Sequence, residues 1–279
     1  MGRYKHSQGH LGVMELAERN KGNSRSGFSL VELLVAMAIT AVVMAAVFKI
    51  YTTQQDSYVL QEQVAEMQQN GRTAKYVMTR EIRMAGYDPI GTAKAGFESA
   101  AVDSVSFSMD ITPKDAEDGE ILAGDLITYK VEDEILKRDE GSNQFIDVAE
   151  NIEAIGFGYA YDEDNDGDVE TCGSDLKWAI DSDGDDFLDL NLDTNGDCKI
   201  DISDDADNDG FIDGTAIAPS VSVENIRAVK IWLLAKTGRP DRNHTSANTY
   251  VVGNTIITTS DSNRRQLLAT TVKCRNMAL

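Results

Sequence analysis

The sequence is poor in the residues that carry most enzyme chemistry. Its 279 residues include three cysteines, three histidines and four prolines. Of the histidines, only His244 lies beyond the first ten residues. A single histidine in the body gives little basis for histidine-dependent acid–base or nucleophilic catalysis. Cys172, Cys198 and Cys274 form neither a CxxC pair nor a Cys/His set, which argues against a zinc or redox motif. We therefore expect a protein that is not an enzyme.

Basic residues are also scarce outside the N-terminus. Residues 1–27 hold five of them against two acidic residues, whereas the whole chain has a net charge of −21. A body this acidic is repelled by nucleic-acid phosphates and lacks the basic stripe that binds them, so nucleic acid is not expected as a partner. Its natural partners are cations. With 42% hydrophobic residues, the chain can still build one globular domain besides an anchor.

A long apolar run follows the polar N-terminus. Residues 1–26 lack the apolar core of a secretory signal, and Met14 is an alternative start of translation. Phe28–Phe48 contains one charge, Glu32, and as a helix it would measure about 30 Å, the thickness of the bilayer's hydrocarbon core. Arg25 precedes the run, so the positive-inside rule predicts a cytoplasmic N-terminus and a periplasmic body. The alternative is a buried core helix, although such helices seldom stay apolar on every face over this length.

An amphipathic pattern continues the helix beyond the transmembrane segment, residues 28–50. In residues 51–88, apolar or small residues recur at spacings of three or four: Leu60, Val64, Met67, Gly71, Ala74, Met78, Ile82 and Ala85. Gly86 is a stop signal, and no proline occurs before Pro89. We expect one helix from about Phe28 to Ala85, which Gly71 weakens by roughly 1 kcal/mol and can bend.

Residues 89–279 read as a β-rich domain. Apolar residues alternate with others in five strand-like segments: Ser104–Met109, Asp125–Val131, Ile152–Tyr161, Ile226–Leu234 and Thr249–Thr258. We expect an α+β fold in which an antiparallel sheet packs on the amphipathic half of the helix.

The junction Ser26-Gly27-Phe28-Ser29-Leu30-Val31-Glu32 resembles the processing site of type IV prepilins and type II secretion pseudopilins. The resemblance implies that residues 1–27 are a leader, that prepilin peptidase cuts between Gly27 and Phe28, and that the new N-terminus is methylated. It further implies a single-pass inner-membrane protein that later joins a pilus at the cell surface. The implied partners are other pilin subunits, the inner-membrane pilus assembly machinery and membrane lipid.

Glu32 has a physical cost that needs an explanation. A carboxylate inside the apolar span costs roughly 2.5–3.5 kcal/mol on insertion scales. In the resembling families, the free amine at Phe28 of one subunit meets Glu32 of its neighbour, and the pair guides assembly in a low-dielectric surrounding. The alternative is that Glu32 reaches back to the membrane face without a partner.

The resemblance extends beyond the anchor. Residues 79–89, 229–237 and the end of the chain, 264–276, are similar to PilW-type minor pilins. This similarity implies a type IV pilin-like fold and a part in pilus assembly. Two departures are a longer leader and the acidic segment in the middle of the chain, which is not a hallmark of that family.

Residues 162–213, here called the aspartate segment, contain twenty acidic residues and two basic ones. Such a segment is either unfolded or held by cations. Acidic or amide side chains occur at the alternate positions that oxygen-binding calcium loops use, with glycines nearby. Four loops are predicted, and their candidate ligands are Asp162, Asp164, Asp166 and Asp168; Asp181, Asp183, Asp185 and Asp189; Asp193, Asn195, Asp197, Asp201 and Asp204; and Asp205, Asp207, Asp209 and Asp213.

The loops open 19, 12 and 12 residues apart, which resembles the calcium repeats of thrombospondin type 3 modules. Oxygen-only ligands favour calcium as the cofactor. Three features differ from an EF-hand: no loop ends in glutamate, long flanking helices are not evident, and Gly184 and Gly196 follow the third position instead of the fifth. We expect weak binding, on the order of 10⁻⁴ to 10⁻³ M. The alternative is a solvated acidic linker.

Three functions agree with these features. The leading one is a minor pilin with a calcium-stabilised insert, and the second is a type II secretion pseudopilin. The third, of another class, is a calcium-dependent adhesin displayed on a pilus for cell adhesion. An exported body also makes one disulfide plausible: three pairings exist, Cys172–Cys198 is preferred because both residues flank acidic loops, and three unpaired thiols are the alternative.

Overall fold

A computed structural model describes residues 27–111 and 120–277. It divides into two compact units, residues 1–55 and 56–279. One long helix, α1 (Leu30–Ile82), begins in the first unit and ends in the second. The expected helix, about Phe28 to Ala85, is therefore present with ends that differ by two or three residues.

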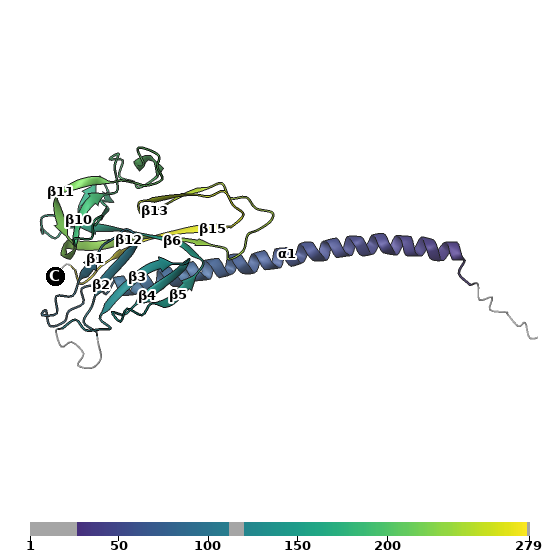
Figure 1. Cartoon of the computed structure of the whole chain (residues 1–279), viewed down its shortest axis with the longest axis horizontal. Coiled ribbons are helices and arrows are strands. Elements are labelled where there is room, and N and C mark those ends of the chain that lie inside the picture. Colours follow the sequence, from purple (N-terminus) through teal and green to yellow (C-terminus); the bar gives the residue numbers. More distant parts are fainter. Residues whose placement is uncertain (1–26, 112–119, 278–279) are drawn as a thin grey trace, which may run out of the picture. The chain divides into compact units, whose positions relative to one another are not determined.

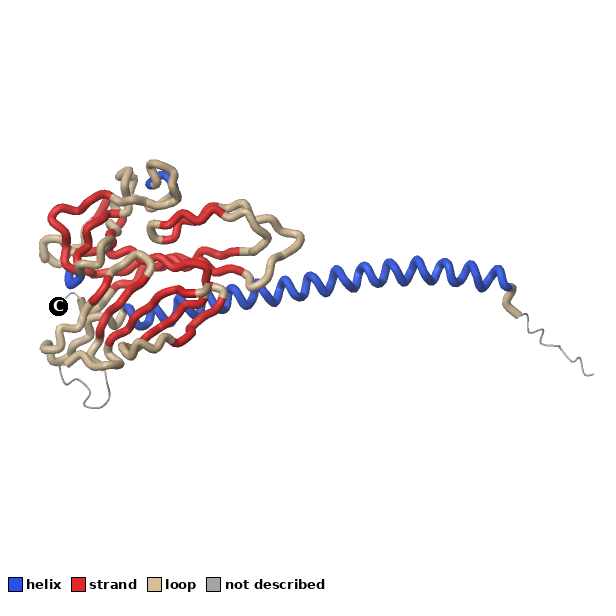
Figure 2. Tube along the Cα trace, in the orientation of Figure 1, coloured by secondary structure: helices blue, strands red, loops and turns tan. Residues whose placement is uncertain are grey.

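In the second unit, two antiparallel sheets pack against one face of the C-terminal part of α1 (Figures 1 and 2). The five-stranded sheet has the order β1-β2-β3-β4-β5, and the six-stranded sheet has the order β11-β10-β9-β6-β12-β15. The strands of the first are β1 (Phe97–Ser99), β2 (Ser104–Ser108), β3 (Leu126–Glu132), β4 (Ile135–Asp139) and β5 (Ile146–Glu150). Those of the second are β6 (Ile152–Tyr161), β9 (Ala179–Ile180), β10 (Phe187–Asn191), β11 (Thr215–Ser222), β12 (Ile226–Lys236) and β15 (Arg265–Lys273).

Two small hairpins complete the described part of the second unit. They are β7 (Thr171–Cys172) with β8 (Asp175–Leu176), and β13 (Thr249–Val252) with β14 (Thr255–Thr258). Two short 3₁₀ turns, η2 (Ile202–Asp204) and η3 (Val223–Asn225), lie between β10 and β11 and between β11 and β12, respectively. The expectation of one strand over Thr249–Thr258 is wrong, because Gly253 has a positive φ of 64° and turns the chain.

The amphipathic stripe of α1 forms the middle of the core. Its buried members are Met67, Gly71, Ala74, Met78 and Ile82, all of which the spacing predicted. They pack with aromatic and branched residues of both sheets. Two polar contacts also hold the helix: the Tyr129 hydroxyl of β3 donates to Glu81 at 2.5 Å, and Arg138 Nε of β4 donates to the same carboxylate at 2.8 Å.

The expectation of a single sheet is wrong, because the strands form two sheets. The chain passes from the first sheet to the second at the connection after β5. Strand β5 ends at Glu150 and β6 begins at Ile152, with Asn151 between them at a φ of 60°. This left-handed residue lets the chain leave the first sheet and pair in the second. Strand β6 then runs antiparallel to β12 from Tyr161 opposite Ile226 to Ile152 opposite Ala235.

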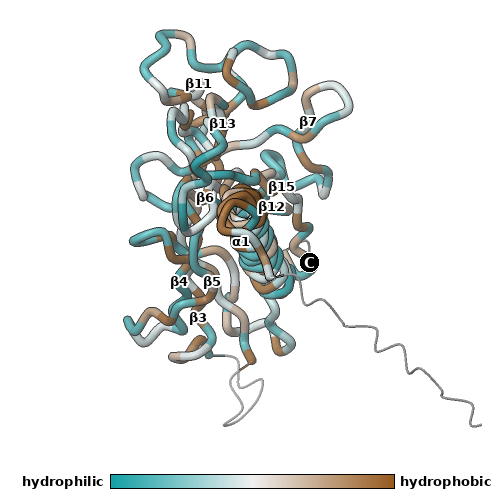
Figure 3. The backbone as a smooth tube through the Cα atoms, turned by 90° about the vertical axis from the view of Figure 1, so that its right-hand side faces the viewer, coloured by the Kyte–Doolittle hydropathy of each residue, from teal (hydrophilic) through white to brown (hydrophobic). Residues whose placement is uncertain are grey.

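The aspartate segment is built into the second sheet and is not a separable insert. Strands β9 and β10 lie within it, and they pair with β6 and β11 respectively. The loops of this segment are rich in acidic residues, and teal stretches of the tube in Figure 3 mark hydrophilic residues near β11. Deleting residues 162–213 would remove two strands from the sheet, so single substitutions are the cleaner test of these loops.

Candidate functional site at the helix start and in the aspartate loops

The start of α1 carries a reciprocal cap that sequence reasoning missed. Glu32 N donates to Ser29 Oγ at 3.2 Å, and Ser29 N donates to Glu32 Oε2 at 3.1 Å. Leu33 N donates to the Ser29 carbonyl at 3.1 Å, which begins the helical ladder. This is a capping box, and its signal, Ser-x-x-Glu before an apolar run, was readable in the sequence. Glu32 therefore fixes the helix start in addition to any role between subunits.

The apolar side chains of the first unit have no protein cover. Phe28 is 86% exposed, Leu30 75% and Val42 71%, and the described residues contain one helix, α1, that is long and apolar enough to cross a membrane. Exposing this much apolar surface to water is unfavourable by about 25 cal/mol for each Å². Lipid or apolar helices of other subunits are the surroundings that fit it. Gly27 and Phe28 are both exposed before the helix, whereas the rest of the leader, residues 1–26, lies outside the described residues.

The four aspartate loops share one backbone arrangement. Numbering each loop from its opening aspartate, the amide of position 6 donates to the carboxylate of position 1 in all four. The pairs are Gly167 to Asp162 at 3.1 Å, Asp186 to Asp181 at 3.1 Å, Cys198 to Asp193 at 3.0 Å, and Gly210 to Asp205 at 3.1 Å. The repeat seen in the sequence is thus a repeat in the structure.

Positions 4 and 6 of each loop have positive φ angles. In the outer loops these are Asn165 and Gly167, then Asn208 and Gly210; in the inner loops they are Gly184 and Asp186, then Gly196 and Cys198. A tight loop with two left-handed residues needs glycine or a tolerant polar residue at both places. In the inner loops the glycine follows the third position, which differs from an EF-hand. These loops nevertheless form the same turn as the outer loops, with glycine at position 4 instead of position 6.

Three of the loops bring their first three acids together. Carboxylate oxygens lie within 4.8 Å of one another in the sets Asp162, Asp164, Asp166; Asp181, Asp183, Asp185; and Asp205, Asp207, Asp209. In each set the opening aspartate is buried and the other two are exposed. The close spacing of like charges is visible at Asp183, whose pKa is raised by desolvation and by the carboxylates of Asp185 and Asp189.

Other predicted ligands serve the loops as hydrogen-bond acceptors. Asp189 accepts from the amide and hydroxyl of Ser182, and Asp201 and Asp204 form the capping box of η2. Within the described residues, no set of three acids around a common point includes Asp168, Asp189, Asp197, Asp201, Asp204 or Asp213.

The loop opened by Asp193 is shaped by a disulfide. Cys198 at its position 6 bonds to Cys172 of β7, the pairing that the sequence analysis preferred. Both sulfurs lie near Asp193, but sulfurs in a disulfide do not act as thiolate ligands. Cys274 is unpaired and buried, and burial raises the pKa of its thiol to about 12. Cys274 is therefore a core residue.

Two buried carboxylate oxygens have no hydrogen-bond partner among the described residues. They are Oδ1 of Asp162 and Oδ1 of Asp205, whose residues are 1% and 8% exposed. A buried acceptor without a partner costs about 1–3 kcal/mol, and more when it is charged. A bound cation would remove that cost, so the donor set of these loops fits an oxygen-binding metal ion.

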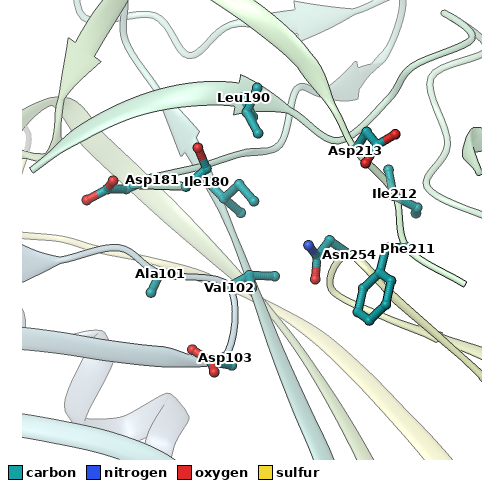
Figure 4. Close-up of a pocket in the computed structure, with 11 residues that line it drawn as sticks. Ala101, Val102, Asp103, Ile180, Asp181, Leu190, Phe211, Ile212, Asp213 and Asn254 are labelled. Carbon is teal, nitrogen blue, oxygen red and sulfur yellow. The ribbon is translucent and has the colours of Figure 1, made fainter. Parts of the chain in front are cut away.

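A cleft of about 400 Å³ lies between the β1–β2 turn, β9, β10 and the loop of Asp205. Asp103, Asp181 and Asp213 line it from three separate segments (Figure 4). In Figure 4 their carboxylates stay apart and do not converge on one point. The cleft itself is therefore not a metal centre.

Comparison with known proteins gives two family matches. Residues 22–48 match the prokaryotic N-terminal methylation motif, and residues 198–276 match Type IV Pilus-assembly protein W. No curated protein matches the chain. Among solved structures, a type IV-like pilin from Thermus thermophilus is similar with 15% identity and a TM-score of 0.39, covering 79% of this chain and 98% of that one.

The methylation motif stands at the head of an exposed apolar helix that is long enough to cross a membrane, and in this region the chain is similar to type IV pilin-like proteins. Its C-terminal region, residues 198–276, is similar to Type IV Pilus-assembly protein W.

Proposed function

We propose that this chain is a minor pilin that takes part in assembly of a type IV pilus. The observation that carries the proposal is the methylation motif at the head of an apolar helix whose side chains have no cover within the protein. The protein starts in the inner membrane with its N-terminus in the cytoplasm and its body in the periplasm. Prepilin peptidase cuts after Gly27, and the trimmed subunit then passes into the pilus.

The contact that drives incorporation joins the amine of Phe28 to Glu32 of the next subunit. Glu32 uses Oε2 to cap its own helix, so its second oxygen is the acceptor for the neighbouring amine. In a low-dielectric surrounding the pair offsets the cost of the buried carboxylate, provided that the geometry is good. The helix cap supports this role, because it holds the carboxylate in one place before the neighbour arrives.

The aspartate loops bind calcium outside the cytoplasm and so stabilise the second unit. Support comes from the carboxylate clusters around Asp162 and Asp205 and from the unpartnered oxygens of these two residues. Oxygen ligands at alternate positions suit a hard cation with six to eight ligands. When bound, the ion neutralises carboxylates that otherwise repel one another.

A second candidate, a calcium-dependent adhesin, is favoured by one feature: an exposed phenylalanine of the fourth loop, Phe211, lines the cleft of Figure 4. A type II secretion pseudopilin would share the anchor, but the match to a pilus-assembly family favours the pilus. Both alternatives keep the membrane anchor, so they differ from the leading proposal in partners alone.

The substitution Glu32→Gln tests the proposal in the native host. Glutamine still closes a capping box, so the helix start is preserved while the charge is lost. We expect the variant to reach the membrane at normal levels but to be missing from sheared pili. Glu62→Gln, which removes an exposed charge elsewhere on α1, is the matched control and should be found in pili. Equal amounts of the Glu32→Gln variant and wild type in pili would contradict the proposal.

A further inference from the structure

We propose that the aspartate segment holds two calcium ions, one in the loop of Asp162 and one in the loop of Asp205, and that the two inner loops are closed without metal. This inference rests on the proposed calcium binding and assigns it to particular loops. The sequence alone predicts four equivalent loops, so the distinction comes from the hydrogen bonds of the opening aspartates.

The opening aspartates of the inner loops accept a backbone hydrogen bond on each of their two oxygens. Asp181 accepts from Gly184 N at 2.7 Å with Oδ1 and from Asp186 N at 3.1 Å with Oδ2. Asp193 does the same with Gly196 at 2.7 Å and Cys198 at 3.0 Å. Each carboxylate thus has a donor on both oxygens, so neither aspartate keeps an acceptor oxygen without a partner.

The opening aspartates of the outer loops are only half used. Gly167 and Gly210 donate to Oδ2 of Asp162 and Asp205, and Oδ1 is left buried without a partner in each. The outer loops also differ at position 4, where they have Asn165 and Asn208 instead of glycine, and no bond from that position reaches Oδ1. The free oxygen is therefore available as a metal ligand.

The remaining ligands come from the same loops. In the fourth loop, Asp207 and Asp209 stand beside Asp205, and in the first loop Asp164 and Asp166 stand beside Asp162. Waters and a backbone carbonyl would complete six to eight oxygens, as in weak extracellular calcium sites.

The two sites differ in their basic neighbours. Arg227 Nη2 lies 3.4 Å from Oδ2 of Asp162 and already supplies positive charge to the first loop. Among the described residues, no ion pair involves Asp205. We therefore expect the fourth loop to bind calcium more tightly than the first.

Calcium in the fourth loop would also secure the β13–β14 hairpin. Ile212 N donates to the Asn254 carbonyl at 2.7 Å, and Ile256 N donates to the Gly210 carbonyl at 2.8 Å. Ile212 is only 1% exposed, which ties the loop into the core. This coupling lies within the region that matches the pilus-assembly family.

Counting bound ions on the full chain in detergent tests the assignment. The chain is stripped with chelator and equilibrated with saturating radioactive calcium by dialysis. Wild type should hold two ions, Asp205→Asn and Asp162→Asn one each, and the double variant none. Asp193→Asn should hold two, and so should Glu163→Gln, which removes an exposed charge beside the first site. Asp207→Asn and Asp164→Asn repeat the test at exposed ligands if the buried variants fail to fold.

The outcomes separate this inference from the proposals on which it rests. Three or four ions on wild type, or an ion lost from Asp193→Asn, would overturn the assignment while leaving calcium binding intact. No bound ion on wild type would overturn both the assignment and the proposed calcium binding. Neither result bears on the minor-pilin proposal, which the Glu32→Gln experiment tests separately.

Discussion

Gly71 of α1 faces Leu268 of β15 so closely that a Cβ on Gly71 would lie 2.7 Å from Leu268 Cδ1 and 3.6 Å from the Cβ of Ala235. Glycine at this place weakens the helix by roughly 1 kcal/mol relative to alanine. The close contact between helix and sheet explains why it is tolerated: α1 stays helical through Gly71, and β12 and β15 pack directly against it.

Gly71→Val should therefore destabilise the second unit. The added branched side chain must displace Leu268, and overpacking of this kind costs about 1–3 kcal/mol. Thermal unfolding of the full chain in detergent measures the loss. Ala65→Val, on an exposed face of the same helix, is the matched control and should change little. Adding Leu268→Ala to Gly71→Val should restore part of the stability; no recovery would show that the contact is not the cause.

The long elements of this fold were predictable, and the way in which they pack was not. The stripe of Met67, Ala74, Met78 and Ile82 predicted the buried face of α1, and alternation gave β6 with its observed ends. The turn at Gly253 was missed although it is local, because Gly253-Asn254 between two strand-like runs is a hairpin signal. The close approach of Gly253 to Gly156 of β6 is different, since it joins distant residues and no local pattern contains it.

The aspartate loops show the same division between local and distant information. Spacing placed four loops correctly in the chain, because the turn and its hydrogen bonds involve neighbouring residues. Spacing could not show that Asp162 and Asp205 each keep a buried oxygen without a partner, since burial is decided by strands far along the chain. For the same reason it described residues 162–213 as an insert, although two strands of the second sheet lie there.

Position 4 of the fourth loop gives a prediction about backbone strain. Asn208 has a φ of 60°, which asparagine and glycine tolerate better than other residues. Asn208→Ala should cost about 1 kcal/mol of stability and weaken calcium binding, whereas Asn208→Gly should cost less. Calorimetric unfolding of both variants with calcium and with chelator makes the comparison. Equal stability of Asn208→Ala and wild type would argue against a strained turn.

The disulfide should contribute to stability through the chain that it closes. Cys172 and Cys198 are 26 residues apart. Closing a loop of this length lowers the entropy of the unfolded chain and so stabilises the folded protein by about 3 kcal/mol. Reducing agent should therefore lower the melting temperature of wild type. The double variant Cys172→Ser/Cys198→Ser should melt at the lower temperature from the start and respond no further to reductant. A wild type that is indifferent to reductant would be the contrary result.

Acid stability should depend on the pair of Asp261 and Arg265. Hydrogen bonds from the Arg265 guanidinium hold the pKa of Asp261 well below its ordinary value of 3.8. Because the folded-state pKa is depressed, the pair stabilises the protein above about pH 4, and this contribution is lost as the pH falls further.

Melting temperatures measured from pH 6 downward in calcium-free buffer test this expectation. Asp261→Asn should lower the melting temperature at pH 6 and flatten its fall below pH 4. Asp147→Asn, an exposed substitution on β5, should leave the shape of the curve unchanged. If Asp261→Asn and wild type lose stability in parallel below pH 4, the ion pair does not govern the acid limb.

In the proposed function, α1 is a membrane anchor that becomes ready for assembly when the leader is removed. Intact-mass spectrometry of the protein extracted from host membranes measures this directly. The account predicts a chain that begins at Phe28, carries one added methyl group and lacks residues 1–27. A full-length chain recovered from the soluble fraction, with its leader in place, would contradict it.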